Sequence, residues 1–222
     1  MIAETHLAPR SPGELLGDAH PLLEQLSSTE DLSPTGLTAG AIGLQRVIDL
    51  PSLRSFLEAY REQVLVPVEL PAIIAAYHHA ARGEARELIA LDVGLRSQAP
   101  IKSFAAASCR VGQRQLSRLR PMRDQRLVKR YLAAIETGDA LGWHTLVYGV
   151  SLAMFSLPLR QGLQNYIEQT TQGFVHSSAK SLRLREADCT SLLLEQTAHV
   201  RGGIETALGQ TQPCLAGALP GI

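Results

Sequence analysis

Cysteine is scarce in this sequence: Cys109, Cys189 and Cys214 lie far apart and form no C-x-x-C pair. Three isolated cysteines argue against a disulfide framework and against a structural zinc site. A reducing compartment is the simpler assumption, so we expect a cytoplasmic protein. The first ten residues also lack an apolar run, and we expect no secretory signal there.

Reactive motifs are missing as well. The chain has no P-loop, no G-x-S-x-G, no H-E-x-x-H and no G-x-G-x-x-G after a strand. The adjacent His78 and His79 would point about 100° apart on a helix, so they cannot chelate together. We therefore predict no catalytic residue, no metal site and no cofactor. An unrecognised helical enzyme would instead need several titratable groups converging in one pocket.

An excess of either charge is absent too. Lys and Arg total 21, as do Asp and Glu, so the net charge is zero and bulk nucleic-acid binding is not expected. Charged residues make up only 19% of the chain, against 45% hydrophobic residues. Two interpretations stay open: a surface partly hidden against partners, or a compact domain with a polar, uncharged surface.

Strand signals are nearly absent, whereas helical periodicity recurs along the chain. We predict an all-α, single-domain bundle of about nine to ten helices, preceded by a flexible segment over 1–20. Asp49 is expected to cap one helix, which runs to about Val66 and is followed by another over 70–82. Gly202-Gly203 is expected to break the last helix, so that the helical domain covers 21–201 and a short tail covers 202–222.

One apolar stretch calls for comparison with a membrane span. Residues 140–159 contain no Asp, Glu, Lys or Arg, and a spanning helix needs about 20 residues. The stretch nevertheless includes Trp143, His144, several hydroxyl side chains and Pro158. We interpret it as a buried central helix and expect no membrane association.

The strongest electrostatic feature is the segment 102–130, which holds nine basic residues against one acid, Asp124. Arg110, Arg114 and Arg118 recur every four residues and would line one side of a helix. This side could be a solvated face balanced by neighbouring acids, or the contact surface for an acidic protein partner. Nucleic acid fits less well, because no aromatic side chains interleave the arginines. Gly112 within this helix costs about 1 kcal/mol relative to alanine, which close packing of another helix would offset.

Several spaced motifs together resemble the UreF family of urease accessory proteins, and the likeness covers about residues 20–200. The motifs are the Pro- and Gly-containing stretch Ser33-Pro34-Thr35-Gly36 with Gly43-Leu44, the two-helix stretch 75–92, Ser108-x-x-x-Gly112-Gln113-x-x-Leu116, the segment 144–150, and Leu157-Pro158-Leu159 followed by Tyr166. Each motif is weak by itself, but their order and spacing are more specific.

The resemblance implies an all-helical, cytosolic, dimeric scaffold without chemistry of its own. Such a protein binds the accessory protein UreD (also called UreH), recruits the GTPase UreG and helps to deliver nickel to apo-urease. On this basis we assign three sets of candidate residues. They are Arg110, Arg114, Arg118, Lys180, Arg185 and Glu186 for partner binding; Thr35, Gly36, Gly40, Gly43 and Gln45 for a dimer or partner surface; and Gly112, Tyr148, Gly149, Pro158 and Tyr166 for helix packing.

The chain departs from the family pattern in three places. In the segment 37–45 an aromatic residue is missing, and Gln45 replaces an acid. Near the end, Lys180 stands where the family has an arginine, and a lysine cannot make a bidentate guanidinium contact. Arg185-Glu186-Ala187 replaces Gly-Gln-Thr, and the tail after Gly202 is short. These departures fit a divergent member with an equally divergent partner.

Overall fold

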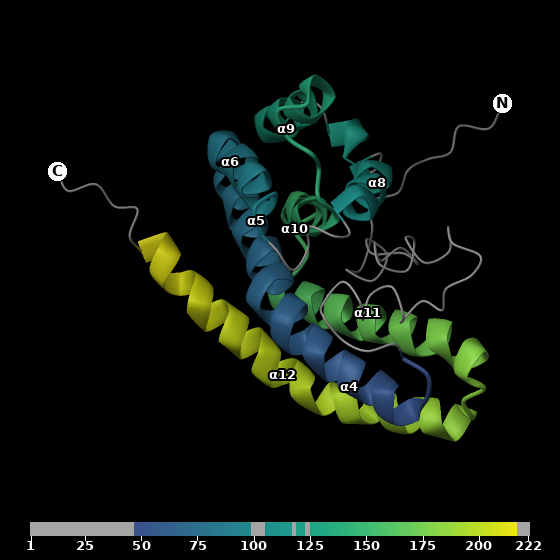
Figure 1. The fold of residues 1–222 in the computed structure, drawn as a ribbon. Coiled ribbons are helices and arrows are strands. Elements are labelled where there is room, and N and C mark those ends of the chain that lie inside the picture. The colour runs from purple at the N-terminus through teal and green to yellow at the C-terminus, as the bar shows by residue number, and fades with distance from the viewer. Residues whose placement is uncertain (1–46, 99–104, 117–118, 123–124, 217–222) are drawn as a thin grey trace.

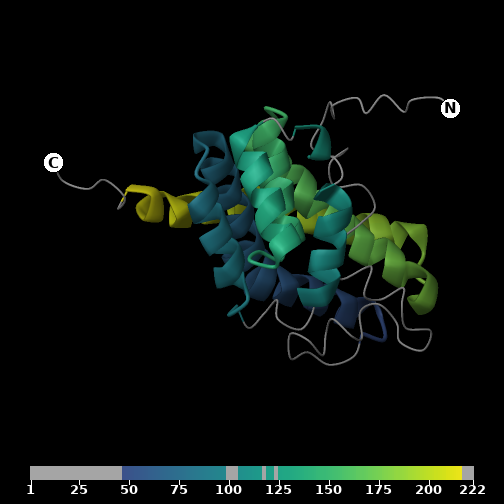
Figure 2. The same cartoon turned by 90° about the horizontal axis from the view of Figure 1, so that it is seen from above.

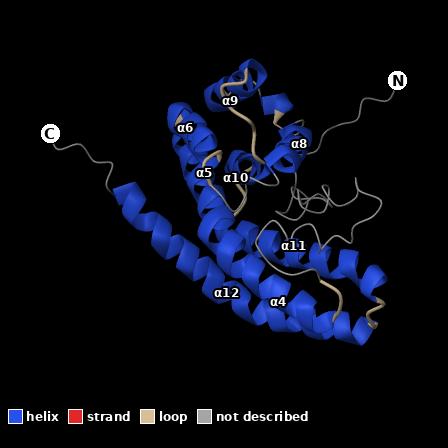
Figure 3. Cartoon of the chain, viewed as in Figure 1, coloured by secondary structure: helices blue, strands red, loops and turns tan. Residues whose placement is uncertain are grey.

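The computed structural model describes residues 47–98, 105–116, 119–122 and 125–216, and every regular element in them is helical (Figures 1 and 3). The all-α prediction is confirmed. The helices are α4 (Leu50–Tyr60), η1 (Arg61–Glu69), α5 (Leu70–Arg82), α6 (Ala85–Leu95), α8 (Ala105–Leu116), η2 (Arg120–Met122), α9 (Arg126–Thr137), α10 (His144–Met154), α11 (Leu159–Leu182) and α12 (Glu186–Ala216).

The first described helix is longer than predicted. Asp49 caps it as expected: its carboxylate accepts the Ser52 N–H at 2.9 Å, and the Ser52 hydroxyl accepts the Asp49 N–H at 3.0 Å. The predicted interruption between residues 66 and 70 is wrong, because α4, η1 and α5 form one continuous helix. The π-helical geometry of η1 accommodates Pro67, which lacks the N–H of a regular helical ladder.

This merger explains why fewer helices are found than predicted. With α4, η1 and α5 counted as one, the described part of the chain holds seven helices plus the short 3-10 turn η2. The flexible segment 1–20 and the first part of the predicted helical domain, residues 21–46, fall outside the described residues. The count of nine to ten is therefore not reached among the residues that the structure describes.

The helix Leu50–Arg82 is also long and apolar enough to cross a membrane by length and composition alone. Half of its most apolar 18-residue stretch is buried inside the protein. The core helix of a soluble protein can have the same length and composition. The uncharged stretch that the sequence singled out instead forms α10, which is too short to span, and residues His144 to Leu152 of it are buried. Its interpretation as a buried central helix is confirmed.

Two glycines let α10 and the loop before it approach neighbouring helices closely. A Cβ on Gly149 would lie 2.4 Å from the backbone oxygen of Ile73 in α5. A Cβ on Gly112 in α8 would lie 1.9 Å from the backbone oxygen of Gly142 and 3.0 Å from the backbone nitrogen of His144. Since real Cβ atoms essentially never come within 3.0 Å of such atoms, only glycine permits this packing of α5, α8 and α10.

Helices α11 and α12 form a long hairpin, and both pack against α4 and α5 (Figures 1 and 2). The predicted break at Gly202-Gly203 is wrong, because α12 continues to Ala216. Each helical glycine costs about 1 kcal/mol, but Ile204 and Ala207 beyond the pair are buried in the core and offset it. Gly203 also lies close to Val66 of η1, within 3.3 Å of where its Cβ would be. The division into a domain over 21–201 and a tail over 202–222 stays a prediction.

The turn between α5 and α6 is held by charged side chains. Gly83 ends α5 in the left-handed region at φ 72°, as its position after the last periodic residue predicts. Glu84 then accepts hydrogen bonds from Arg82 Nε and from His79 Nδ1, each at 2.7 Å. These hydrogen bonds lower the pKa of the Glu84 carboxyl to about 2, and the bond from Arg82 has the larger effect.

The turn should therefore contribute a pH-dependent stability. A carboxyl with a depressed pKa in the folded state stabilises the fold above its unfolded pKa and loses that contribution as pH falls towards 2. We expect Glu84→Gln to lower the Tm by about 2 °C at neutral pH. The difference should shrink as the pH drops from about 5 to about 3. Thermal melts of both proteins across this range measure it, and a constant difference would contradict the assignment.

Candidate functional site

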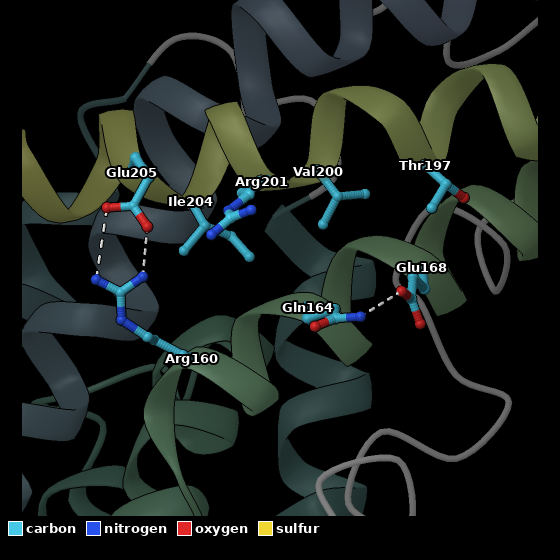
Figure 4. Close-up of a pocket in the computed structure, with 8 residues that line it drawn as sticks. All are labelled: Arg160, Gln164, Glu168, Thr197, Val200, Arg201, Ile204 and Glu205. Atoms are coloured by element: carbon cyan, nitrogen blue, oxygen red, sulfur yellow. Dashed lines mark hydrogen bonds and ion pairs between the residues drawn. The ribbon is translucent and has the colours of Figure 1, made fainter.

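A groove runs along the surface between α11 and α12 and encloses about 350 Å³ (Figure 4). Val200 and Ile204 of α12 supply its apolar part. The Arg160 guanidinium bonds to the Glu205 carboxylate at one end, and Gln164 Nε2 donates to Glu168 Oε1 at 2.9 Å near the other. Thr197 and Arg201 complete the lining. An apolar centre between polar, charged edges suits contact with another protein.

The local sequence explains why this groove forms. Pro158 is the N-cap of α11, and Arg183 ends the helix in the left-handed region at φ 52°. The Arg185 guanidinium then makes two 2.9 Å bonds to the Asp188 carboxylate in the first turn of α12. This turn sends α12 back along α11, and smaller hollows by Leu193 and Gln196 continue the groove towards η1.

A second cluster of polar groups lies inside the core. His144 Nδ1 is 2.9 Å from the Ser108 hydroxyl, and His144 Nε2 is 2.6 Å from the Tyr166 hydroxyl. Tyr166 and Tyr60 in turn donate to the Glu69 carboxylate at 3.1 and 2.6 Å. Because Tyr166 donates to Glu69, its oxygen accepts a hydrogen bond from His144 Nε2–H, which leaves Nδ1 to accept a hydrogen bond from Ser108 in the neutral imidazole.

A serine next to a histidine could in principle act as a nucleophile with its base. Here both side chains are 1% exposed, as is Glu69, so no substrate can reach them. Burial, together with the charge of Glu69, raises the pKa of Tyr60 and of Tyr166 well above its usual value. The cluster therefore joins α8, α10, α11 and the Leu50–Arg82 helix through hydrogen bonds.

Asp92 forms another buried polar centre, where α6, α9 and the loop before α10 meet. Its carboxylate accepts the backbone N–H groups of Leu141 and Gly142 at 2.7 and 3.0 Å and the hydroxyl of Tyr131 at 2.9 Å. Trp143 Nε1 donates to its backbone oxygen at 3.0 Å. Burial, then the charge of Asp92, raises the pKa of Tyr131 well above its usual value. Asp92 thus fixes the loop that lies against Gly112.

The predicted partner-binding residues do not gather in one place. Arg110 and Arg114 are exposed on α8 and have interaction partners, and Arg118 lies outside the described residues. Lys180 belongs to α11, Arg185 is engaged with Asp188, and Glu186 is exposed at the start of α12. In Figure 1, α8 and the hairpin of α11 and α12 lie on different sides of the molecule. The segment with Thr35, Gly36, Gly40, Gly43 and Gln45 is also outside the described residues.

The predicted helix-packing residues lie mostly in the interior. Gly112 and Gly149 are at the close approaches described above. The Tyr148 hydroxyl donates to the Gly162 backbone oxygen at 3.0 Å, and Tyr166 belongs to the buried cluster. Pro158 is exposed at the start of α11.

Sequence reasoning missed the groove and the two buried acids. Glu69 and Asp92 each stand among apolar residues of a helix, and this isolation is the signal that could have found them. The groove residues carry no such signal, because Glu168 and Arg201 look like ordinary solvated positions. Among the described residues, no group of three or more His, Cys, Asp or Glu side chains could hold a metal ion.

Comparison with known proteins gives one clear result. A search of curated proteins found no match. The model of the UreF family matches residues 47–197, which is more than half of the chain and includes the stretch 75–92 and the motifs around Gly112, His144 and Tyr166. This match and the all-helical fold confirm the resemblance drawn from those motifs, and the chain therefore belongs to the UreF family of urease accessory proteins.

Proposed function

We propose that this protein is a non-catalytic cytoplasmic scaffold that promotes nickel insertion into apo-urease. It does so as a homodimer that binds a UreD/UreH-like protein and a UreG-like GTPase. The observation that carries the proposal is the family match over residues 47–197, because the family is an accessory, non-catalytic one.

The interior of the protein supports a role without chemistry. Its converging polar groups, from Ser108 through His144 and Tyr166 to Glu69, are buried and linked to one another by hydrogen bonds. Buried networks of this kind hold helices in one arrangement. A rigid helical body with surface grooves suits a scaffold, which must present two partners in a constant geometry.

We assign partner contact to the groove between α11 and α12 and to the turn that leads into α12. The groove has an apolar base formed by the largely buried Val200 and Ile204 between charged edges, and the turn presents Arg185 and Glu186 at the surface. The segment 35–45 remains the proposed dimer or partner surface.

Co-expression tests this function. The tagged chain is produced with UreD-like and UreG-like proteins and the apo-urease of the same source, and retained proteins are identified after affinity capture. We expect both accessory proteins to be retained, and urease activity in nickel-supplemented lysate to fall at least about tenfold when the chain is omitted. Passage of both partners through the column, with unchanged urease activity, would refute the proposal.

A further inference from the structure

We infer that the exposed face of α9, with η2 beside it, is a docking surface for an acidic patch on a protein partner. The inference rests on the proposed function, since it names the chemistry of one contact in that assembly. The surface, called the α9 basic face below, consists of Arg120, Arg126, Lys129 and Arg130. All four residues are exposed, and none of them forms an ion pair within the part of the chain that the structure describes.

The fold forces these cations onto one side of α9. Leu127, Val128 and Tyr131 are buried, because this side of the helix packs towards α6. Arg126, Lys129 and Arg130 are spaced by three and four residues, so they share the opposite, solvent side. Contacts between α9 and η2 bring Arg120 into the same region.

This arrangement works against the stability of the helix. Like charges three or four residues apart repel each other by a few tenths of a kcal/mol per pair. The first turns of a helix also carry a positive partial charge, and the first turn of α9 contains no acidic residue. An anionic partner surface would relieve both repulsions when it binds, whereas an isolated solvated face gains nothing from them.

The composition of the face selects the class of partner. The aromatic residue of α9, Tyr131, is buried, so no ring is available there to stack on bases. The remaining exposed positions of the helix include Ala133, Glu136 and Thr137, none of which could insert into a lipid bilayer. Because the whole chain carries no net charge, the positive potential is local and suits a partner patch of limited size.

The full-length chain tests the inference, with Lys129→Glu/Arg130→Glu as the variant. Two controls accompany it: Lys129→Arg/Arg130→Lys keeps both charges, and Arg86→Glu reverses an exposed cation on α6. The probes are the purified UreD-like and UreG-like proteins and apo-urease, each titrated at about 50 and 300 mM salt. Reversal introduces acids near the N-terminus of α9, so the Tm should hold or rise, which shows that the variant folds.

We expect one of these proteins to bind the reversal variant about tenfold more weakly at low salt, and wild type to lose affinity as salt rises. Both controls should bind like wild type. Retention of all partners by the reversal variant with wild-type affinity would overturn the docking surface but leave the scaffold function intact. Absence of any complex with wild type would overturn both. Binding of a 20-base-pair DNA duplex or of vesicles containing phosphatidylserine through these residues, with partner binding unchanged, would also overturn it.

Discussion

Gly149→Ala should lower the free energy of unfolding by about 3 kcal/mol or more, at the upper end of the range for overpacked cores. The new Cβ would lie 2.4 Å from the Ile73 backbone oxygen and 3.0 Å from the Ala76 Cβ. Neither group is the end of a flexible side chain, so α10 and α5 must move apart. Because α10 is buried between α5 and α8, that movement disturbs the centre of the core. Urea denaturation followed by circular dichroism measures the change.

Gly202→Ala is the matched control for this experiment. Gly202 is also inside a helix, but no atom lies within 4 Å of the position its Cβ would take. The alanine should therefore stabilise the protein by up to about 1 kcal/mol, the difference in helix propensity. Equal effects of the two substitutions would show that the close approach of α10 and α5 does not limit stability.

Asp92→Ala should destabilise the protein by about 4 kcal/mol. The substitution leaves two backbone N–H groups and the Tyr131 hydroxyl without their buried acceptor, and each such group costs about 1–3 kcal/mol. Part of this loss would be relieved by local rearrangement or by water entering the space. The loop of Leu141 and Gly142 should then loosen, which faster amide hydrogen exchange at these two residues would report.

Two variants separate the role of Asp92 from a general sensitivity to mutation. Tyr131→Phe removes one of the three donors and should cost only about 1 kcal/mol. Asp139→Ala removes an exposed acid that accepts a bond from Thr137 and should change stability by less than about 0.5 kcal/mol. A loss for Asp92→Ala no larger than that for Asp139→Ala would show that the buried carboxylate does not hold the loop.

Several features of the fold followed from short stretches of sequence. The Asp49 cap and the end of α5 at Gly83 were predicted correctly, because each depends on residues within one turn of the helix. The all-α class and the family followed from periodicity and from motif order. These signals are local, and the surrounding structure does not need to be known to interpret them.

Other features could not be predicted, because they depend on distant contacts. Pro67 and the Gly202-Gly203 pair are helix breakers by their own chemistry, yet both lie inside continuous helices. The burial of Val64, Ile204 and Ala207 offsets their cost, and that burial exists only once α12 has packed against the first helix. The groove likewise depends on a distant contact, the packing of α12 along α11.

By itself, the sequence determined that this chain is helical, where individual helices are capped, and which family it belongs to. Backbone hydrogen bonds, caps and side-chain periodicity act over a few residues, so they can be inferred from residues that are neighbours in the sequence. Only the tertiary structure decided that Ser108, His144, Tyr166 and Glu69 meet in the core rather than at a surface. The reason is that solvent access depends on which helices cover a side chain. Here α8, α10, α11 and the Leu50–Arg82 helix, which are separate in the sequence, pack together around these four residues.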